Sequence, residues 1–258
     1  MANKALKTTP KTTATTPKIS VKIWRPIIEK LDSKIEMACL RRDAYLAKVL
    51  ETELGCLDEE VSIPNSQACY DFVSKRLDQL DRKLVSLALP AELTERLNEI
   101  CRRKRIVRDA FFNRLFLLLA VSPIHIDKLF FNALGSVWRE EVWRECKDDG
   151  QSFQSGFYPL EDRIDPFWAI RSGLEISARN EGLEDYIEPT SGKSIQVKRE
   201  VTDIAPADSL YTTVFEKLGN NDLLGLNCYL PDWRVPGLYA EQQHRVKLDE
   251  LLSELEAL

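Results

Sequence analysis

The chain has 258 residues, of which 44% are hydrophobic and 30% charged, so it can bury a core and is not a disordered chain. Its longest apolar run, residues 115–121, is much shorter than the roughly 20 residues that span a bilayer, which excludes a transmembrane segment. The N-terminus lacks the apolar region of a secretory signal, none of the six cysteines forms a C-x-x-C pair, and there are only two histidines. We therefore expect a cytoplasmic protein with reduced thiols, no membrane association, no cofactor or metal site and no histidine-dependent catalysis.

The net charge of −5 is distributed unevenly along the chain. Residues 1–122 contain 22 Lys and Arg against 16 Asp and Glu, a net charge of +6, whereas residues 123–258 contain 14 against 25, a net charge of −11. This asymmetry indicates that only the first half faces a polyanion.

The first half contains an internal repeat. Residues 18–54 align with residues 84–120 at an offset of 66, without a gap, and apolar residues fall on apolar residues almost throughout. A solenoid needs about three repeats or more, so two copies fit a duplicated small domain instead.

Each copy begins with a predicted strand, at residues 18–23 and 84–89. Apolar residues alternate with others in these segments, which is typical of a strand with one buried face. The residues predicted to face outward are Lys18, Ser20 and Lys22 in the first copy and Leu84, Ser86 and Ala88 in the second.

Two predicted helices follow each strand. Pro26 and Pro90 end the strands and can open the first helix, because Pro suits the first helical turn. Apolar residues at helical spacing form the stripe of this helix, and a basic turn follows it. Asp43 and Asp109 are good N-cap residues for the second helix.

The segment between the copies, residues 65–82, is also predicted to be helical. The connection is long enough for the two copies to pair within one chain as a pseudo-dimer. The alternative is that each copy pairs with its counterpart in a second chain, as a homodimer.

The second half carries fewer signals. The predicted elements are an amphipathic helix at 123–146, a loop at 148–156, a strand at 194–201 and a terminal amphipathic helix at 242–258. A Gly-Lys-Ser sequence does not make a phosphate-binding loop, because Ile187 stands where that loop needs glycine. Asp185 followed by Gln196 and Lys198 faintly resembles the pattern of a Mg²⁺-dependent nuclease.

The order strand, helix, turn, helix in about 35 residues resembles the ribbon-helix-helix family of DNA-binding proteins, the Arc- and MetJ-like repressors. The second copy is the closer match, since residues 85–93, VSLALPAEL, look like the family's strand-to-helix opening. The resemblance implies that two units pair their strands into an antiparallel ribbon, whose outward face reads base edges in the major groove of duplex DNA. It also implies that the N-terminus of the second helix contacts phosphate.

The candidate DNA-binding residues are Lys18, Ser20, Lys22, Arg25, Arg41, Arg42, Ser86, Arg105 and Arg108. Lysine can donate to guanine O6 and N7, whereas Leu84 and Ala88 carry no charge, so the first strand is expected to be the stronger reader. The arginines could supply a phosphate contact that Asp43 and Asp109 would oppose, or they could form a solvated basic face. Residues 1–17 are rich in Thr and carry Lys without acid, which suits a disordered basic arm along DNA or a solubilising tail.

We therefore expect an α+β, mainly helical chain, with two ribbon-helix-helix units followed by a mixed α/β C-terminal domain. The predicted function is sequence-specific binding of duplex DNA, as a transcriptional regulator and not an enzyme. The main alternative is an interaction protein, an antitoxin or adaptor, in which residues 157–258 bind a protein partner. The predicted divisions are an arm at 1–17, the first unit at 18–56, a helical linker at 57–83, the second unit at 84–122 and the acidic C-terminal domain at 123–258.

Overall fold

The structure is a computed structural model, and it describes the chain in eight segments. These are residues 18–121, 123–131, 165–168, 170–174, 183–187, 194–198, 208–218 and 220–235. The predicted arm at 1–17, the loop at 148–156 and the terminal helix at 242–258 lie outside the described residues.

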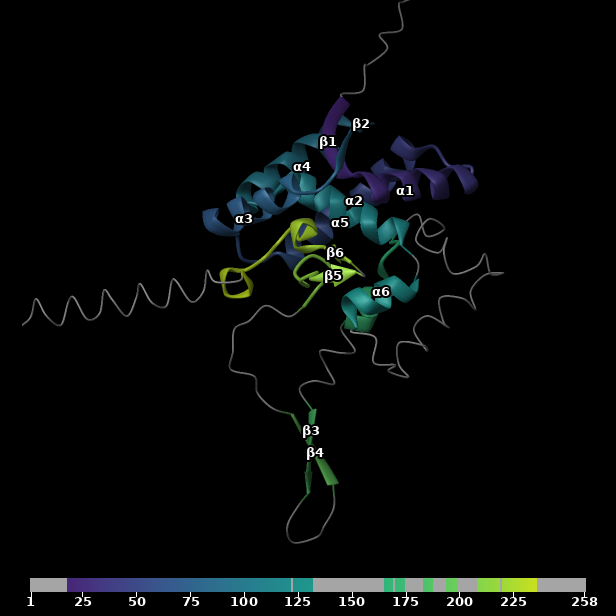
Figure 1. Ribbon diagram of the computed structural model, residues 1–258. Helices are drawn as coiled ribbons and strands as arrows, with labels where there is room; N and C mark the ends of the chain where they lie inside the picture. The colour runs from purple at the N-terminus through teal and green to yellow at the C-terminus, as the bar shows by residue number, and fades with distance from the viewer. Residues whose placement is uncertain are drawn as a thin grey trace, which may run out of the picture.

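The described chain is a mixed α/β structure, mostly helical, with small antiparallel sheets (Figure 1). None of its helices is long and apolar enough to cross a membrane within the described residues. In chain order the elements are β1 (Lys18–Trp24), α1 (Arg25–Met37), α2 (Arg42–Glu60), α3 (Gln67–Asp78), β2 (Arg82–Ala88), α4 (Ala91–Lys104), α5 (Arg108–Ala120), α6 (Pro123–Phe130), β3 (Leu183–Ile187), β4 (Ser194–Lys198), β5 (Lys217–Leu218), β6 (Asn221–Asp222), η1 (Leu224–Leu226) and η2 (Asp232–Arg234).

The strands that open the two copies pair with each other within one chain. β1 and β2 are antiparallel, and the register places Ser20 opposite Ser86, Lys18 opposite Ala88 and Lys22 opposite Leu84. The inward residues of both strands are buried, as their alternation predicted. The order strand, helix, helix is therefore present twice, with the two strands forming one ribbon.

The turn between the two helices of each copy has the same backbone geometry. Cys39 and Arg105, which are counterparts in the repeat, have φ of 55° and 49° and are the only non-glycine residues with positive φ among those described. In each turn a backbone N–H bonds back to the helix, from Leu40 to Ile35 and from Ile106 to Cys101. These bonds satisfy carbonyl groups at the helix end, so both copies turn in the same way.

The prediction that Asp43 and Asp109 are N-cap residues is wrong. The N-cap residues of α2 and α5 are Arg41 and Val107, and neither makes a side-chain cap hydrogen bond. The two aspartates lie two positions beyond these N-caps, as the second residue of each helix, and backbone N–H groups of the ribbon bind their carboxylates, as described below.

One continuous hydrophobic core joins the repeat to the described C-terminal residues. α5 lies beneath the ribbon and is buried on all sides from Ala110 to Ala120. The ribbon covers one side of this helix, and residues 208–218 and 220–235 lie on the opposite side (Figure 1). A helix with an apolar surface all round needs such cover on every side.

Two elements of the second half were anticipated in part. β4 falls within the strand predicted at 194–201, and it pairs with β3 in an antiparallel hairpin. α6 begins where the helix over 123–146 was predicted and ends at Phe130; residues 132–146 lie outside the described segments.

Candidate nucleic-acid interface

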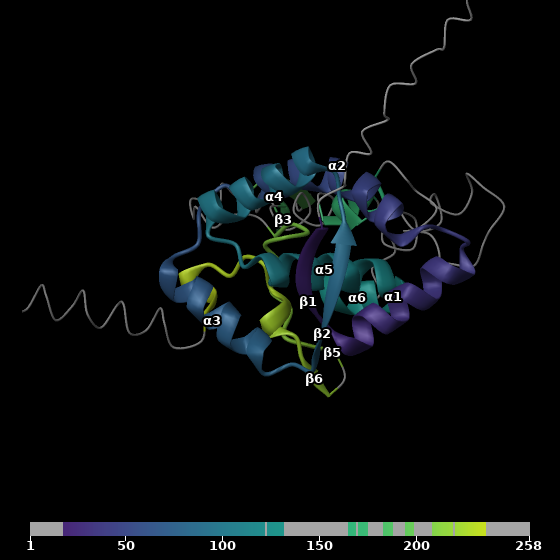
Figure 2. The same ribbon diagram turned by 90° about the horizontal axis from the view of Figure 1, so that it is seen from above.

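The outer face of the ribbon presents the residues that the alternation placed there. Lys18, Ser20 and Lys22 are exposed on β1, and neither lysine forms an ion pair with another described residue. Figure 2 looks onto this face, with the ribbon crossing the middle of the molecule and α5 behind it. The two ammonium groups are therefore available to a ligand that lies along the ribbon.

The outer face of β2 is much less polar than that of β1. Leu84 is 66% exposed and lies opposite Lys22, while Ala88 lies opposite Lys18. Ser86 is exposed and faces Ser20 at the centre. On the outer face, β1 thus carries a lysine on either side of Ser20, whereas β2 carries Leu84 and Ala88 on either side of Ser86.

Two arginines, one at the start of the second helix of each copy, each bind the strand of the other copy. Arg42 donates from Nη2 to the carbonyl O of Ser86 at 3.1 Å, and Arg108 donates from Nη2 to the carbonyl O of Ser20, also at 3.1 Å. Arg42 and Arg108 are counterparts in the repeat. Each helix therefore fixes the strand of the other unit, which couples the two copies at the centre of the ribbon.

The two aspartates make the matching contacts to backbone N–H groups. Asp43 Oδ2 accepts from the N–H of Ala88 at 2.9 Å, and the N–H of Lys22 donates to Asp109. Burial raises the pKa of the Asp109 carboxyl, although this hydrogen bond and the neighbouring cations lower it. Both carboxylates are engaged with the strands, so they serve to align the ribbon.

The remaining predicted basic residues have different surroundings. Arg25 forms an ion pair with Asp81 through Nε and Oδ2 at 2.8 Å, and both side chains are exposed. Arg41 is exposed at the start of α2. Arg105 donates from Nη1 to the carbonyl O of Asn65 at 3.3 Å, which fixes the turn before α5 to the segment before α3. Arg41 is thus the least constrained of the three.

Asn113 supports β1 from below and was not singled out from the sequence. Its Oδ1 accepts from the N–H of Trp24 at 2.8 Å, and its Nδ2 donates to the carbonyl O of Lys22 at 2.9 Å. The counterpart of Asn113 in the first copy is Ala47, which cannot make these bonds. Among the described residues, an amide side chain therefore holds β1 from beneath, next to the exposed Lys22, and Ala47 offers β2 no equivalent.

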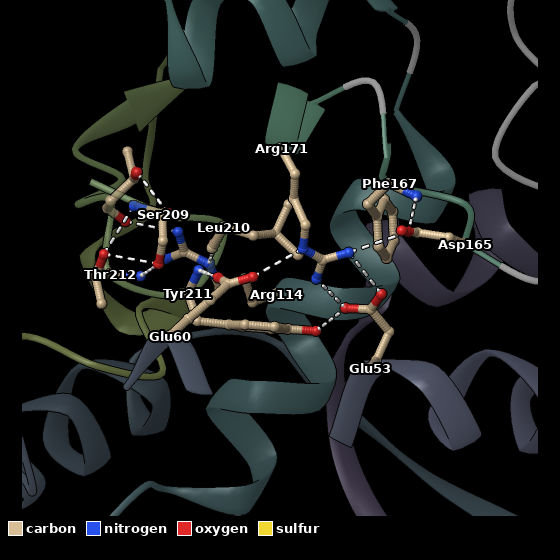
Figure 3. Close-up of polar contacts among 11 residues, drawn as sticks. Glu53, Glu60, Arg114, Asp165, Phe167, Arg171, Ser209, Leu210, Tyr211 and Thr212 are labelled. Atoms are coloured by element: carbon tan, nitrogen blue, oxygen red, sulfur yellow. Dashed lines mark hydrogen bonds and ion pairs between the residues drawn. The ribbon is translucent and has the colours of Figure 1, made fainter. Parts of the chain in front are cut away.

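A buried ion-pair cluster fastens α2 to the described C-terminal residues (Figure 3). Arg171 contacts Glu53 Oε2 and Glu60 Oε1, each at 2.8 Å, and Asp165 Oδ1 at 3.1 Å. The hydroxyl of Tyr211 donates to Glu53, which is 0% exposed. Burial raises the pKa of the Glu53 carboxyl, while the hydrogen bonds from Arg171 and Tyr211 lower it.

This cluster acts as a structural fastening, because the guanidinium of Arg171 fills the space between the carboxylates. No group of His, Cys, Asp and Glu suited to a metal ion occurs among the residues that the structure describes. Asp185, Gln196 and Lys198, which form the faint nuclease pattern, lie in the β3–β4 hairpin. Its register places Asp185 opposite Gln196 and Lys198 opposite Leu183.

A second buried arginine joins α5 to the residues beneath it. Arg114 is 0% exposed and donates to the carbonyl O of Leu210 at 2.7 Å, to the carbonyl O of Thr213 at 2.6 Å and to Asn227 Oδ1 at 3.0 Å. Its guanidinium also lies 3.8 Å from the centre of the Phe215 ring. Together with Arg171 it joins the helices of the repeat to the described C-terminal residues.

Comparisons of the chain with protein-family models, with curated proteins and with solved structures find no match. Function is therefore inferred from the geometry of the ribbon and of the residues around it.

Proposed function

We propose that the two strand–helix–helix copies are ribbon-helix-helix units and that the protein binds duplex DNA sequence-specifically, as a transcriptional regulator. The observation that carries this proposal is the β1–β2 ribbon, whose outer face exposes Lys18 and Lys22 without ion-pair partners among the described residues. A two-stranded ribbon has the width to enter the major groove, where base edges differ for all four base pairs.

The surroundings of the ribbon suit this role in three ways. The strands are aligned by reciprocal bonds from Arg42 and Arg108, so the outward side chains are held in a fixed register. The half of the chain that forms the ribbon has a net charge of +6 from 22 basic and 16 acidic residues in 1–122, which favours a polyanionic partner. The C-terminal residues that are described pack on the opposite side, so they leave the groove-facing surface open (Figure 1).

The test is selection of bound fragments from a pool of genomic duplexes, followed by salt titration of the preferred fragment. We expect the logarithm of the affinity to fall with the logarithm of the salt concentration, by about 0.9 for each phosphate neutralised. The double variant Lys18→Ala, Lys22→Ala should lose the preference for the selected fragment, because each good base contact contributes about 1–3 kcal/mol of discrimination.

The matched control removes two exposed lysines from the opposite side of the molecule, Lys128→Ala in α6 and Lys217→Ala in β5. This control should bind the selected fragment as the unchanged protein does. Absence of duplex binding at low salt, or equal losses in the two double variants, would overturn the proposal and favour the adaptor alternative.

A further inference from the structure

The β3–β4 hairpin stands apart from the other described elements. Figure 1 shows it projecting from the body on the side opposite the ribbon, with both strands running along the direction of the projection. Its strands pair only with each other, because each sheet among the described residues has two strands. An isolated two-stranded hairpin is at best marginally stable in water, whereas three or more strands with an apolar face can be stable. A further strand at a free edge of this hairpin would therefore stabilise it.

The register of the hairpin gathers apolar residues on one of its faces. Tyr186 lies opposite Ile195, and Glu184 lies opposite Val197. These four residues share a face, because alternate residues of a strand lie on the same side of a sheet. Three of the four are apolar, and apolar cross-strand pairs are a main source of sheet stability.

The free edges of the two strands differ in charge. β3 has Glu184 and Asp185 at its second and third positions, and charged residues in an edge strand oppose pairing with another chain. The middle of β4 is uncharged, since Ile195, Gln196 and Val197 follow one another there. The edge of β4 is therefore the more open of the two to a further strand.

The sequence of β4 is complementary to a second copy of itself. Antiparallel pairing of two β4 strands about a two-fold axis at Gln196 sets Gln196 opposite its own copy. Ile195 then lies opposite the partner's Val197, so apolar residues meet. Ser194 lies opposite the partner's Lys198, so no like charges face each other.

The other pairings of two hairpins are less favourable. The same two-fold operation on β3 would place Asp185 opposite its own copy, and like charges directly opposite each other destabilise a sheet. Pairing of β3 with the β4 strand of another copy would be head-to-tail, which leaves a free edge at each end and continues into a larger assembly. Pairing of β4 with β4 closes after two copies.

We propose that two copies of this chain associate by pairing their β4 strands, which joins the two hairpins into one sheet of four strands. The apolar residues Tyr186, Ile195 and Val197 of both copies then share one face of that sheet. The dimer forms without DNA, so it is independent of the proposed function.

The direction of the hairpin determines how the two copies are arranged. Its strands run along the line that leads away from the body, and antiparallel pairing reverses this line in the second copy (Figure 1). The second body therefore lies beyond the far end of the hairpin, and the two ribbons face away from each other. A consequence that rests on the proposed function is that the dimer bridges two separate duplex segments.

Sedimentation equilibrium of the full chain without DNA tests the pairing. The unchanged protein should dimerise in a concentration-dependent manner. Gln196→Lys should weaken the dimer by about two- to fivefold, because it sets like charges opposite each other across the axis, and high salt should restore part of the loss by screening. Within the hairpin the new side chain lies opposite Asp185, which favours the hairpin itself. A monomer at every concentration, or equal dimerisation of the variant, would overturn the proposal.

Charge complementation tests the position of the two-fold axis. A second variant, Gln196→Glu with Asp185→Asn, carries the opposite charge at the same place and lacks the carboxylate that would lie opposite it in the hairpin. Mixed with Gln196→Lys, it should form heterodimers in preference to either homodimer, which native mass spectrometry measures. Heterodimers in the proportion of random mixing would overturn the pairing at Gln196.

The matched control is Asp185→Asn alone, which changes the charge of β3 and leaves β4 as it is. It should dimerise as the unchanged protein does. Stronger dimerisation would show that removal of the facing carboxylates favours the interface, and it would overturn the assignment to β4 in favour of β3.

A bridging assay tests the arrangement of the two ribbons. The selected duplex is fixed to beads, and a labelled copy of the same fragment is added with the protein. We expect the unchanged protein to retain labelled duplex on the beads, and Gln196→Lys to retain less although it binds a single duplex equally well. Equal retention by the two proteins would overturn the bridging role. Loss of all duplex binding by the unchanged protein would overturn the proposed function, whereas the dimer is measured without DNA.

Discussion

Ser20 lies directly opposite Ser86 in the ribbon, and Ser86 is also the residue that corresponds to Ser20 in the second copy of the repeat, 66 positions later. A residue can face its counterpart only where a two-fold axis crosses the ribbon. The same axis exchanges the bonds from Arg42 to Ser86 and from Arg108 to Ser20, each of 3.1 Å. The two copies of the repeat are therefore related by an internal pseudo-two-fold axis that passes through the serine pair.

The two aspartates that align the strands are expected to contribute comparably to stability. Asp43→Ala and Asp109→Ala should each lower the free energy of unfolding by about 1–3 kcal/mol, because each leaves a strand N–H without a charged acceptor. Urea unfolding measures the change, with Glu95→Ala, an exposed residue of α4, as the control. A loss no larger than that of the control would show that the aspartates do not hold the ribbon.

Recognition by the two strands is expected to be unequal. Lys22→Ala should relax or weaken specific binding far more than Ala88→Gly. A good base contact discriminates by about 1–3 kcal/mol, and the methyl group of Ala88 can make no hydrogen bond to a base. The selected site should not be a clean palindrome, since Lys18 and Lys22 correspond to Leu84 and Ala88 across the axis.

The measurement is site selection followed by competition with base-substituted duplexes. A perfectly palindromic site would show that identical copies from two chains pair on DNA instead. Negligible effects of both Lys18→Ala and Lys22→Ala would remove β1 as the reader.

The repeat and its elements could be predicted from the sequence because their signals are local. Alternation over residues 18–23 and helical spacing after Pro26 and Pro90 are complete within a few residues, and the structure confirms the strands and the paired helices there. The N-cap prediction for Asp43 failed for a non-local reason. Its carboxylate binds the N–H of Ala88, 45 positions away, and no local pattern shows that partner.

The buried arginines had no sequence signal for the same reason. Arg114 finds its acceptors at Leu210, Thr213 and Asn227, at separations of 96 to 113 residues. Within the apolar run around it, a single arginine looks like an interruption of the helix's buried face. Only the covering residues show that its charge is buried and hydrogen-bonded through all three nitrogen atoms.

Arg114 is expected to be among the most sensitive positions. Arg114→Ala leaves the carbonyl oxygens of Leu210 and Thr213 without this donor, removes one of the two donors to Asn227 Oδ1 and removes the contact with Phe215, so it should destabilise the fold by about 3–5 kcal/mol. Arg114→Lys should recover only part of the lost stability, because an ammonium group cannot reproduce the planar arrangement of N–H donors of a guanidinium. Thermal and urea unfolding test this against Arg103→Ala, whose exposed ion pair with Asp58 is worth about 0–1 kcal/mol. Similar losses in the two alanine variants would contradict the buried role.

Lys34 is expected to make stability depend on pH in the alkaline range. Burial, together with the nearby charge of Lys30, lowers the pKa of Lys34 to about 8, whereas an unfolded lysine has a pKa of about 10.4. Between about pH 8 and pH 10 the unfolded chain then binds more protons than the folded chain, so this residue makes the free energy of unfolding rise with pH. Lys34→Met should make that slope less positive.

The slope is obtained from urea unfolding at several pH values across the window. Lys48→Met, which removes an exposed lysine of α2, is the control and should leave the slope unchanged. An identical slope for Lys34→Met and the unchanged protein would show that Lys34 is not desolvated in the folded state.

Two glycines in different surroundings are expected to respond to alanine in opposite directions. A Cβ on Gly225 in η1 would lie 2.9 Å from the carbonyl carbon of Arg76 and 3.0 Å from the backbone N of Leu77. Both atoms belong to the backbone of α3, which cannot move without disturbing the helix, so Gly225→Ala should destabilise the fold by about 1–3 kcal/mol.

A Cβ on Gly55 in α2 would meet only the end of the Arg96 side chain, at 3.5 Å. Gly55→Ala should therefore stabilise the fold by about 0.5–1 kcal/mol, because alanine loses less backbone entropy in a helix. Urea unfolding of the two variants under the same conditions measures both changes, and a stabilising Gly225→Ala would show that η1 does not pack closely against α3.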